Sequence, residues 1–102
     1  MSHTYISSLI EARRYWEIWS RQDRLIKAID LIVKDKQRRN IQPARATLRE
    51  IKAEVDEKEW REFLPQLVSY AVVDEQKTIN GYTYSVNHKQ ARVFEKERMN
   101  YL

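Results

Sequence analysis

Two helix-capping patterns stand nine residues apart in the middle of this chain, and they limit the folds available to it. The first is Thr47-x-x-Glu50 and the second is Asp56-x-x-Glu59. In such a box the first side chain accepts a hydrogen bond from the backbone N–H three residues on, and the acidic side chain reaches back to the first residue's N–H. The phase of the apolar residues also shifts between the two boxes. We therefore expect two short helices at an angle rather than one straight helix.

The apolar residues around the boxes indicate which face each short helix buries. In the first helix Leu48, Ile51 and Val55 lie on one face at helical spacing. Val55 and Trp60 also flank the second box as a hydrophobic staple. The second helix is expected to bury Trp60, Phe63, Leu64, Leu67 and Val68.

Residues 1–42 contain neither glycine nor proline, and their apolar residues recur at helical spacing. The phase slips between Trp19 and Leu25, where Ser20 and Asp23 are suited to cap a new helix. We expect two helices, at about 4–20 and 22–38, joined by a kink. One continuous helix is the alternative.

The stretch from Arg38 to Pro43 ends this pattern. Asn40 and Pro43 are typical loop residues, and the residue before a proline favours extended backbone. Ile41 is a candidate for a one-residue strand in this loop.

Two further segments are rich in β-branched and aromatic residues and are predicted to be strands, at residues 71–73 and 82–86. The segment 74–81 between them ends in Asn80-Gly81, which favours a turn with positive φ. From about residue 89 a last helix is predicted to reach residue 100. We expect its Val93 and Phe94 to face inward, and its outward residues to be Lys96, Glu97 and Arg98.

Composition supports one small helical domain over residues 1–102. The chain has 42% hydrophobic residues, one glycine and no cysteine, so a disulfide scaffold and a thiolate zinc site are excluded. No apolar run approaches the roughly 18 residues that a membrane span needs, and no signal peptide opens the chain. We therefore expect a cytoplasmic protein of the α+β class, mainly α-helical with a small antiparallel β hairpin.

The predicted order is helix, loop, short helix, turn, helix and hairpin, with extra helices at both ends. Over residues 25–87 this order resembles the winged helix–turn–helix family of DNA-binding domains. The segment TLREIKAEV is similar to the first helix of such a motif, DEKEWREFLPQLVSYAVV to the turn and second helix, and NGYTYSV to the returning wing strand. Ala71 stands where the family usually has glycine. The resemblance implies a winged-helix core at about 22–87 and flanking helices at 4–20 and 89–100.

Length and composition also resemble those of small proteins from filamentous viruses that infect hyperthermophilic archaea, although no motif carries this resemblance. It would imply an intracellular protein that acts on viral or host promoters in an infected cell.

In the winged-helix family the second helix of the pair lies in the major groove, while the wing and helix ends contact phosphates. Residues 34–52 carry seven basic and two acidic residues, a net charge of +5 that exceeds the +4 of the whole chain. A solvated charged surface is the alternative explanation. The candidate phosphate contacts in this segment are Lys36, Arg38, Arg39, Arg45 and Arg49.

The second helix of the pair carries fewer suitable groups. Its candidate contacts are Lys58, Arg61 and Gln66, while its acidic residues Glu57, Glu59 and Glu62 repel phosphates. Pro65 removes a backbone donor, so we expect a kink or a restart there. The wing adds the candidates Lys77 and Asn80.

The sequence carries no pattern for catalysis or metal binding. His3 and His88 are the only histidines, and neither a glycine-rich phosphate loop nor a serine elbow is present. We therefore expect no enzyme activity, no metal, no cofactor and no small-molecule substrate.

The first helix carries a row of aromatic residues that a winged-helix domain does not need to complete its own hydrophobic core. A base-stacking platform is one explanation, and a core or dimer surface is the one that we favour. By resemblance to family members that dimerise through terminal helices, the candidate dimer contacts are Tyr5, Leu9, Trp16, Trp19 and Phe94.

The sequence thus predicts a homodimeric, duplex-DNA-binding regulator of transcription that contacts mainly phosphates. The competing hypothesis is a protein-interaction or assembly module on the same scaffold that binds no DNA, because fold alone does not decide function.

Overall fold

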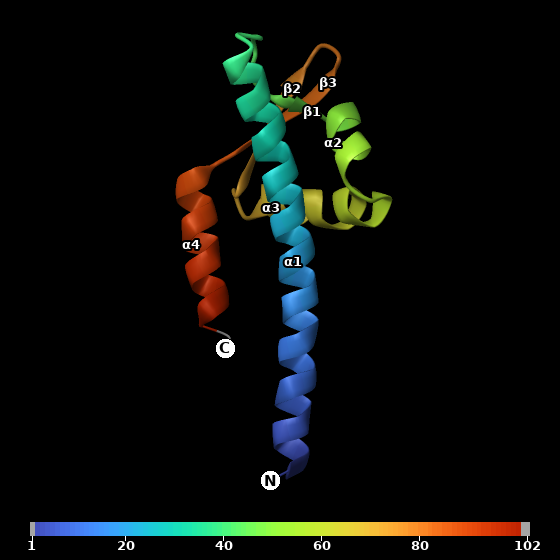
Figure 1. Ribbon diagram of the computed structural model, residues 1–102, viewed down its shortest axis with the longest axis vertical. Helices are drawn as coiled ribbons and strands as arrows, with labels where there is room; N and C mark the ends of the chain where they lie inside the picture. The colour runs from blue at the N-terminus through green and yellow to red at the C-terminus, as the bar shows by residue number, and fades with distance from the viewer. Residues whose placement is uncertain (1, 101–102) are drawn as a thin grey trace.

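The computed structural model describes the backbone of residues 2–100 and the side chains of residues 11–100. The long helix α1 (Ser2–Arg38) runs the length of the molecule, which measures 57 Å along its longest axis. Helix α4 (His88–Met99) lies on one side of α1, and α2 (Leu48–Glu54) lies on the other (Figure 1). The order of the remaining elements between α1 and α4 is β1 (Ala46–Thr47), η1 (Glu59–Phe63), α3 (Leu64–Ser69), β2 (Val73–Thr78) and β3 (Gly81–Val86).

The expected kink near Ser20 is wrong, because α1 is one continuous helix. The position that the apolar pattern left empty between Trp19 and Leu25 is occupied by Gln22, which is buried. Its side chain accepts a hydrogen bond from Arg98 Nη2 at 2.8 Å and donates to Gln66 Oε1 at 3.5 Å. A polar residue thus continues the inward face of the helix, because it has partners on two other helices.

Helix α1 ends where the sequence predicted. Asn40 adopts a left-handed conformation with φ of 57°, and the Ile41 N–H donates to the carbonyl of Lys36 at 2.9 Å. This bond pattern is a common helix terminator. The expected strand residue Ile41 is wrong, since the strand in this region is β1. It forms there because β3 offers pairing partners, with Ala46 opposite Tyr84.

The first capping box is confirmed, with both reciprocal hydrogen bonds between Thr47 and Glu50. The second box is wrong, although a helix does begin after Asp56. The backbone carbonyl of Asp56 accepts from the N–H groups of Glu59 and Trp60. The side chain of Glu59 is buried instead of reaching back to cap.

The expected restart at Pro65 is confirmed. Residues Glu59–Phe63 form a π-helical segment, and the regular helix α3 begins at Leu64 with the proline at its second position. A proline lacks the N–H that a helix interior requires and clashes with the preceding turn. The wider π-helical turn removes that conflict, because the hydrogen-bond pattern changes directly before the proline.

The sheet is antiparallel and has three strands in the order β1-β3-β2, so it has one strand more than the predicted hairpin. Residues 74–78, expected in a turn, belong to β2, and the turn itself is Ile79-Asn80. Polar residues are compatible with a strand here, because both faces of β2 beyond Val73 are exposed. Gly81 has the expected positive φ, at 128°.

Ala71, which stands where glycine was expected by resemblance, has a φ of 60°. Its N–H donates to the carbonyl of Val68, and the N–H of Val72 donates to the carbonyl of Leu67, each at 3.0 Å. This pair of bonds forms a helix-terminating motif that requires a left-handed residue. The backbone therefore needs the glycine-like conformation even though the residue is alanine.

The buried apolar residues form one cluster beneath the sheet and between the helices. It comprises Leu25, Ile29, Val33, Ala46, Ile51, Phe63, Leu64, Leu67, Val72, Val73 and Tyr84. The predicted core positions Leu48, Val55, Trp60 and Val68 are half-buried against it.

Helix α4 spans nearly the predicted residues, but two of its expected orientations are wrong. Val93 is exposed rather than inward, and Arg98 is buried rather than outward. Arg98 turns inward because Gln22 and Asp23 of α1 accept hydrogen bonds from its guanidinium. The aliphatic Val93 remains on the surface because nothing packs over that side of α4 within residues 11–100.

Candidate nucleic-acid interface

Lys36 was predicted to contact phosphate, but its ammonium group is used inside the fold. The side chain is only 16% exposed, and Nζ donates to Glu50 Oε1 at 2.6 Å and to the carbonyl of Arg45 at 2.8 Å. Burial raises the pKa of Glu50, but the hydrogen bonds from Lys36 and Thr47 outweigh it and leave that pKa below its ordinary value. Lys36 therefore joins α1 to the start of α2 and is not available to a ligand.

Arg45 is likewise a structural residue, with a side chain that is 14% exposed. Its guanidinium donates to the hydroxyls of Thr83 and Ser85 at 3.0 and 2.9 Å and to the carbonyl of Asp74 at 2.9 Å. It also pairs with the Asp74 carboxylate at 3.0 Å. These contacts connect the segment before β1 to both long strands, so the prediction that Arg45 faces phosphate is wrong.

Arg38 and Arg39 lie at the end of α1 and are exposed, as a phosphate contact requires. Both pair with Asp35, Arg38 at 2.6 Å and Arg39 at 3.4 Å. The hydrogen bond from Arg38 is the largest influence that lowers the pKa of Asp35. A surface pair of this kind is weak and opens at little cost, so both guanidinium groups remain able to bind an anion.

Arg49 is exposed on α2 and makes no ion pair within residues 11–100. Its neighbour Lys52 lies over the ring of Trp60, with Nζ 4.3 Å from the ring centroid. Both residues are exposed, and Arg49 is the one of the two without such a contact within residues 11–100.

The segment that the sequence assigned to base contacts carries mixed charge. Lys58 is exposed, and Arg61 pairs with Glu57 at 2.7 Å. Glu59 was expected to repel phosphate, but it is buried and lies 3.4 Å from Arg24 of α1. The acidic character of this face is thus smaller than the sequence indicated.

Gln66 is directed partly toward α1, where it accepts the long hydrogen bond from Gln22. Gln66 is exposed, but it lies near the end of the helical segment that contacts α1, whereas Lys58 lies at the start of that segment.

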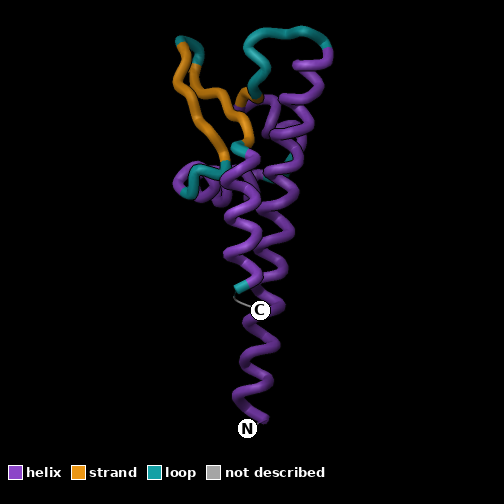
Figure 2. The backbone as a smooth tube through the Cα atoms, turned by 90° about the vertical axis from the view of Figure 1, so that its left-hand side faces the viewer, coloured by secondary structure: helices purple, strands orange, loops and turns teal. Residues whose placement is uncertain are grey.

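The β2–β3 hairpin projects from the end of the molecule that also holds the C-terminal end of α1 (Figures 1 and 2). Lys77 and Asn80 are exposed there, and Ile79 at the tip is fully exposed. Below the tip, Tyr84 is buried and hydrogen-bonded to Glu75. Burial first, and then that hydrogen bond, raises the pKa of Tyr84 to about 12.

Charge is distributed unevenly along the chain. Residues 48–86, which include the two short helices and the hairpin, carry five basic and eight acidic residues, a net charge of −3. Residues 1–47 and 87–102 together carry a net charge of +7. The positive field thus comes mainly from α1, the following loop and α4.

The predicted dimer residues fall into three groups. The side chains of Tyr5 and Leu9 lie outside the described residues. Trp16 is 57% exposed, whereas Trp19 is half-buried and meets Trp16 edge-on with ring centroids 6.1 Å apart. Phe94 is used within the chain, because it stacks on Tyr70 and lies under the guanidinium of Arg98.

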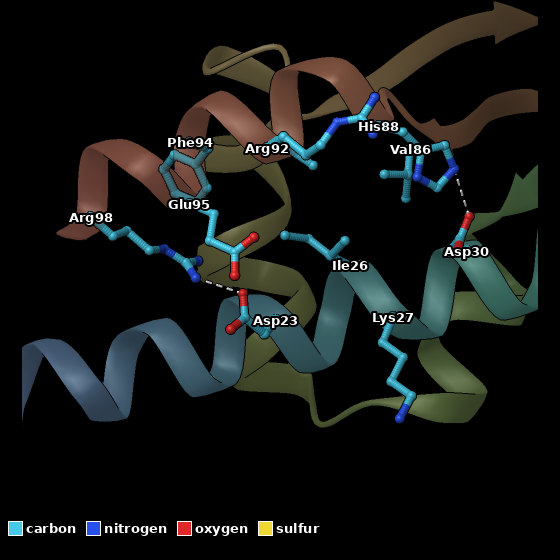
Figure 3. A pocket seen from close by; sticks show the side chains of 11 residues that line it. Asp23, Ile26, Lys27, Asp30, Val86, His88, Arg92, Phe94, Glu95 and Arg98 are labelled. Atoms are coloured by element: carbon cyan, nitrogen blue, oxygen red, sulfur yellow. Dashed lines mark hydrogen bonds and ion pairs between the residues drawn. The ribbon is translucent and has the colours of Figure 1, made fainter.

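A cleft of about 410 Å³ separates α1 from α4 (Figure 3). Arg98 pairs with Asp23 across it at 2.6 Å, and His88 Nε2 lies 3.1 Å from a carboxylate oxygen of Asp30. Lys27 points away from α4. Among residues 11–100 no group of three His, Asp or Glu is placed to hold a metal ion.

The sequence carried a partial signal for the role of Arg45 that its charge concealed. Thr83 and Ser85 alternate along the predicted returning strand, and alternate residues share one face of a strand. Two hydroxyls on one face are natural acceptors for a guanidinium. The burial of Glu59 had no such signal, because its partner Arg24 lies 35 residues away.

No helix within the described residues is both long and apolar enough to cross a membrane. Comparisons of the chain with protein-family models, with curated proteins and with solved structures give no match.

Proposed function

We propose that this protein binds duplex DNA through a winged-helix arrangement and contacts chiefly the phosphate backbone. The connectivity is the observation that supports this proposal. The short strand β1 lies between α1 and α2 and pairs with β3, and the helical segment from η1 to α3 precedes the β2–β3 hairpin. A winged-helix domain has the same order of elements, with the hairpin as the wing.

The proposed contacts are the exposed cations that the fold leaves available. Arg49 and Lys58 make no ion pair within residues 11–100, and Lys77 is exposed on the hairpin. Arg38 and Arg39 add charge at the end of α1 that lies nearest the hairpin tip. Lys36 and Arg45 are not among the contacts, because the ammonium group of Lys36 and the guanidinium group of Arg45 are hydrogen-bonded within the fold.

The exposed side chains of the η1–α3 segment predict that the protein recognises little of the base sequence of DNA. The outward face of residues 57–69 carries the Glu57–Arg61 pair, Glu62 and Pro65, so Arg61 is the one cation among them that suits a base edge. Phosphate contacts supply affinity without sequence information. We therefore infer a DNA-binding protein that tolerates many sequences.

Fluorescence anisotropy with two duplexes of unrelated sequence, between about 50 and 200 mM salt, tests the proposal. Both duplexes should bind with similar, salt-sensitive affinity. Arg49→Gln should weaken binding to both and lower the slope of log K against log salt by about one. Lys96→Gln, on the far side of α1, is the matched control and should leave the slope unchanged. No binding at low salt, or an equal effect of the two variants, contradicts the proposal.

The net charge of −3 over residues 48–86 favours a second candidate, a protein-interaction module. The fully exposed Ile79 at the hairpin tip, next to the exposed Tyr82, would then contact the partner. Ile79→Lys separates the two candidates. If the hairpin contacts DNA, the added cation raises DNA affinity; if it does not, DNA affinity is unchanged.

A further inference from the structure

The C-terminal half of α4 lies beside the middle of α1, and beyond it α1 continues as a lone helix (Figures 1 and 2). A groove of about 570 Å³ opens where α1, α3 and α4 meet, with Tyr70 directly after α3 in its wall. This volume lies within the range of about 300–1,000 Å³ that is usual for small-molecule sites. We call it the aromatic groove, because it is lined by Tyr15, Trp19, Tyr70 and Phe94.

The aromatic residues of the groove form two stacked pairs. Tyr15 stacks on Trp19 of the same helix, with ring centroids 5.7 Å apart. Tyr70 stacks on Phe94 of α4 at 5.5 Å. The guanidinium carbon of Arg98 lies 5.8 Å from the ring centroid of Trp19 and 4.4 Å from that of Phe94. One buried cation thus contacts a ring of each pair, while Tyr70 is 53% exposed and offers its ring to a flat ligand.

Hydrogen-bonding groups flank these rings along α4. Gln90 precedes Phe94 by four residues and Glu97 follows it by three, so they lie about 6 and 5 Å from it along the helix axis. All three residues line the groove. Within residues 11–100 the side chain of Gln90 makes no hydrogen bond and Glu97 makes no ion pair. A flat ligand stacked on Tyr70 therefore has an amide toward one edge and a carboxylate toward the other.

The aromatic groove offers no free cation to a phosphate group. Arg98 is the only basic residue among the described residues that line it, and its terminal nitrogens donate to Asp23 and Gln22. The carboxylate of Glu97 repels an anion. A purely aliphatic ligand is also a poor fit, because it would cover Gln90 and Glu97 and leave them without partners. The groove thus matches an uncharged aromatic ring with polar edges.

We propose that the aromatic groove binds an unpaired nucleobase that carries an exocyclic amine. The base stacks on Tyr70, as bases do on exposed aromatic side chains. Its amine donates to Glu97, since a carboxylate only accepts hydrogen bonds, and the amide of Gln90 both donates and accepts at the other edge. Uracil and thymine are disfavoured, because the N–H that they offer to Glu97 stands between two carbonyl oxygens that the carboxylate repels.

The base must be unpaired, because in a duplex its faces are stacked and its edge is paired. It enters the groove either as a free nucleoside or as part of a single strand. The site shares no residue with the proposed duplex contacts Arg49, Lys58 and Lys77, so it does not depend on the proposed function.

Titration of the full, ¹⁵N-labelled chain with adenosine tests the site by NMR. Adenosine carries no phosphate, so the duplex contacts do not contribute. The chain has three tryptophans, and each gives its own indole N–H signal. The signal of Trp19 should shift, whereas that of Trp60, which packs against the core outside the groove, should not. Uridine should bind at least about fivefold more weakly, because one hydrogen bond is lost.

Two pairs of variants identify the contacts. Tyr70→Ala should weaken adenosine binding by about tenfold or more, because the stacking surface is lost. Tyr82→Ala on the hairpin is its matched control, since Tyr82 is 47% exposed and lies outside the groove. Glu97→Leu should bring adenosine and uridine to similar affinity. Glu95→Leu, on the same helix but lining the cleft of Figure 3, should keep the preference for adenosine. Circular dichroism confirms that each variant remains folded.

Short oligo(dA) and oligo(dT) strands separate the two sources of the base. If the ligand is a single strand, oligo(dA) binds more tightly than adenosine and more tightly than oligo(dT), and Tyr70→Ala removes the difference between the two strands. If the ligand is a free nucleoside, oligo(dA) binds no more tightly than adenosine. Both results support a base in the groove.

Three outcomes overturn the inference. The first is a Trp19 signal that does not move with adenosine or oligo(dA) up to their solubility limits. The second is an equal loss of affinity in Tyr70→Ala and Tyr82→Ala. The third is a Trp19 signal that moves with protein concentration alone, which shows that a second copy covers the groove. Duplex binding that persists in any of these cases leaves the proposed function standing.

Discussion

Arg98 donates a 2.6 Å hydrogen bond from Nη1 to the carboxylate of Asp23, which joins the end of α4 to the middle of α1 across 75 residues of sequence. Its other terminal nitrogen donates to the buried Gln22 at 2.8 Å. Its guanidinium also lies 4.4 Å above the ring of Phe94. These contacts make Arg98 the main polar connection that holds α4 on α1.

Arg98→Leu should lower the free energy of unfolding by about 2 kcal/mol, because it leaves the side-chain oxygen of the buried Gln22 without a hydrogen-bond donor. Asp23→Asn should cost less than about 1 kcal/mol, because the Asp23 side chain is 61% exposed and water replaces the lost charge. Urea unfolding at one fixed protein concentration measures both. Equal losses would show that the ion pair, and not the buried amide, dominates.

The structure separates two arginines that the sequence treated alike. Arg45→Met should destabilise the protein by about 2 kcal/mol, since the buried Thr83 and the half-buried Ser85 lose a donor together. Arg49→Ala should change stability by less than about 0.5 kcal/mol, as is usual for an exposed residue without partners. Thermal or urea unfolding of both variants, beside the anisotropy titration, compares the two effects. A large loss of stability in Arg49→Ala would contradict the assignment of Arg49 as a free surface cation.

The Lys36–Glu50 pair predicts a component of acid unfolding. The pKa of Glu50 lies below its ordinary value of 4.5 in the folded protein, so the ionised carboxylate stabilises the fold. That contribution is fully present above about pH 4.5 and is lost as the pH falls through the lowered pKa. Glu50→Gln should therefore remove this part of the pH dependence.

Glu54→Gln is the matched control for that variant. Glu54 lies on the same helix, is exposed and makes no ion pair within residues 11–100. Urea midpoints between about pH 3 and pH 7 should fall with acid in the unmodified protein and in Glu54→Gln, and should fall less in Glu50→Gln. Parallel curves for all three proteins would show that the capping carboxylate does not contribute.

Ala71→Gly should stabilise the protein by about 1 kcal/mol, because glycine adopts a φ of 60° without the strain that a Cβ introduces. Ala53→Gly, at an exposed position inside α2, should destabilise it by a similar amount through the helix propensity of glycine. The opposite signs make the pair informative in a single set of thermal melts. A loss of stability in Ala71→Gly would show that the alanine side chain contributes contacts that outweigh the backbone strain.

Much of the local structure was predictable because its causes lie close together in sequence. The reciprocal bonds of Thr47 and Glu50 span three residues, and the termination at Asn40 and the restart at Pro65 each depend on a single residue type. The positive φ of Gly81 belongs to the same class. The mainly helical composition and the antiparallel pairing of the last two strands followed from these signals.

Tertiary structure alone decided the contacts between distant segments. Gln22 continues the buried face of α1 only because Arg98 and Gln66 lie opposite it, so the apparent break in the sequence pattern is no break in the helix. β1 exists because β3 is adjacent, and a two-residue strand carries no pattern of its own. Glu59 turns inward toward Arg24, which no local rule predicts.

The same distinction applies to the candidate site. The sequence determined that basic residues concentrate in residues 34–52, since charge is a property of composition. Only the tertiary structure decided which of them are available. A lysine or arginine donates to acceptors wherever the fold presents them, as Lys36 does to Glu50 and Arg45 does to Thr83. Arg49 remains exposed because no acceptor within residues 11–100 faces it, and that depends on the packing of segments that the sequence keeps far apart.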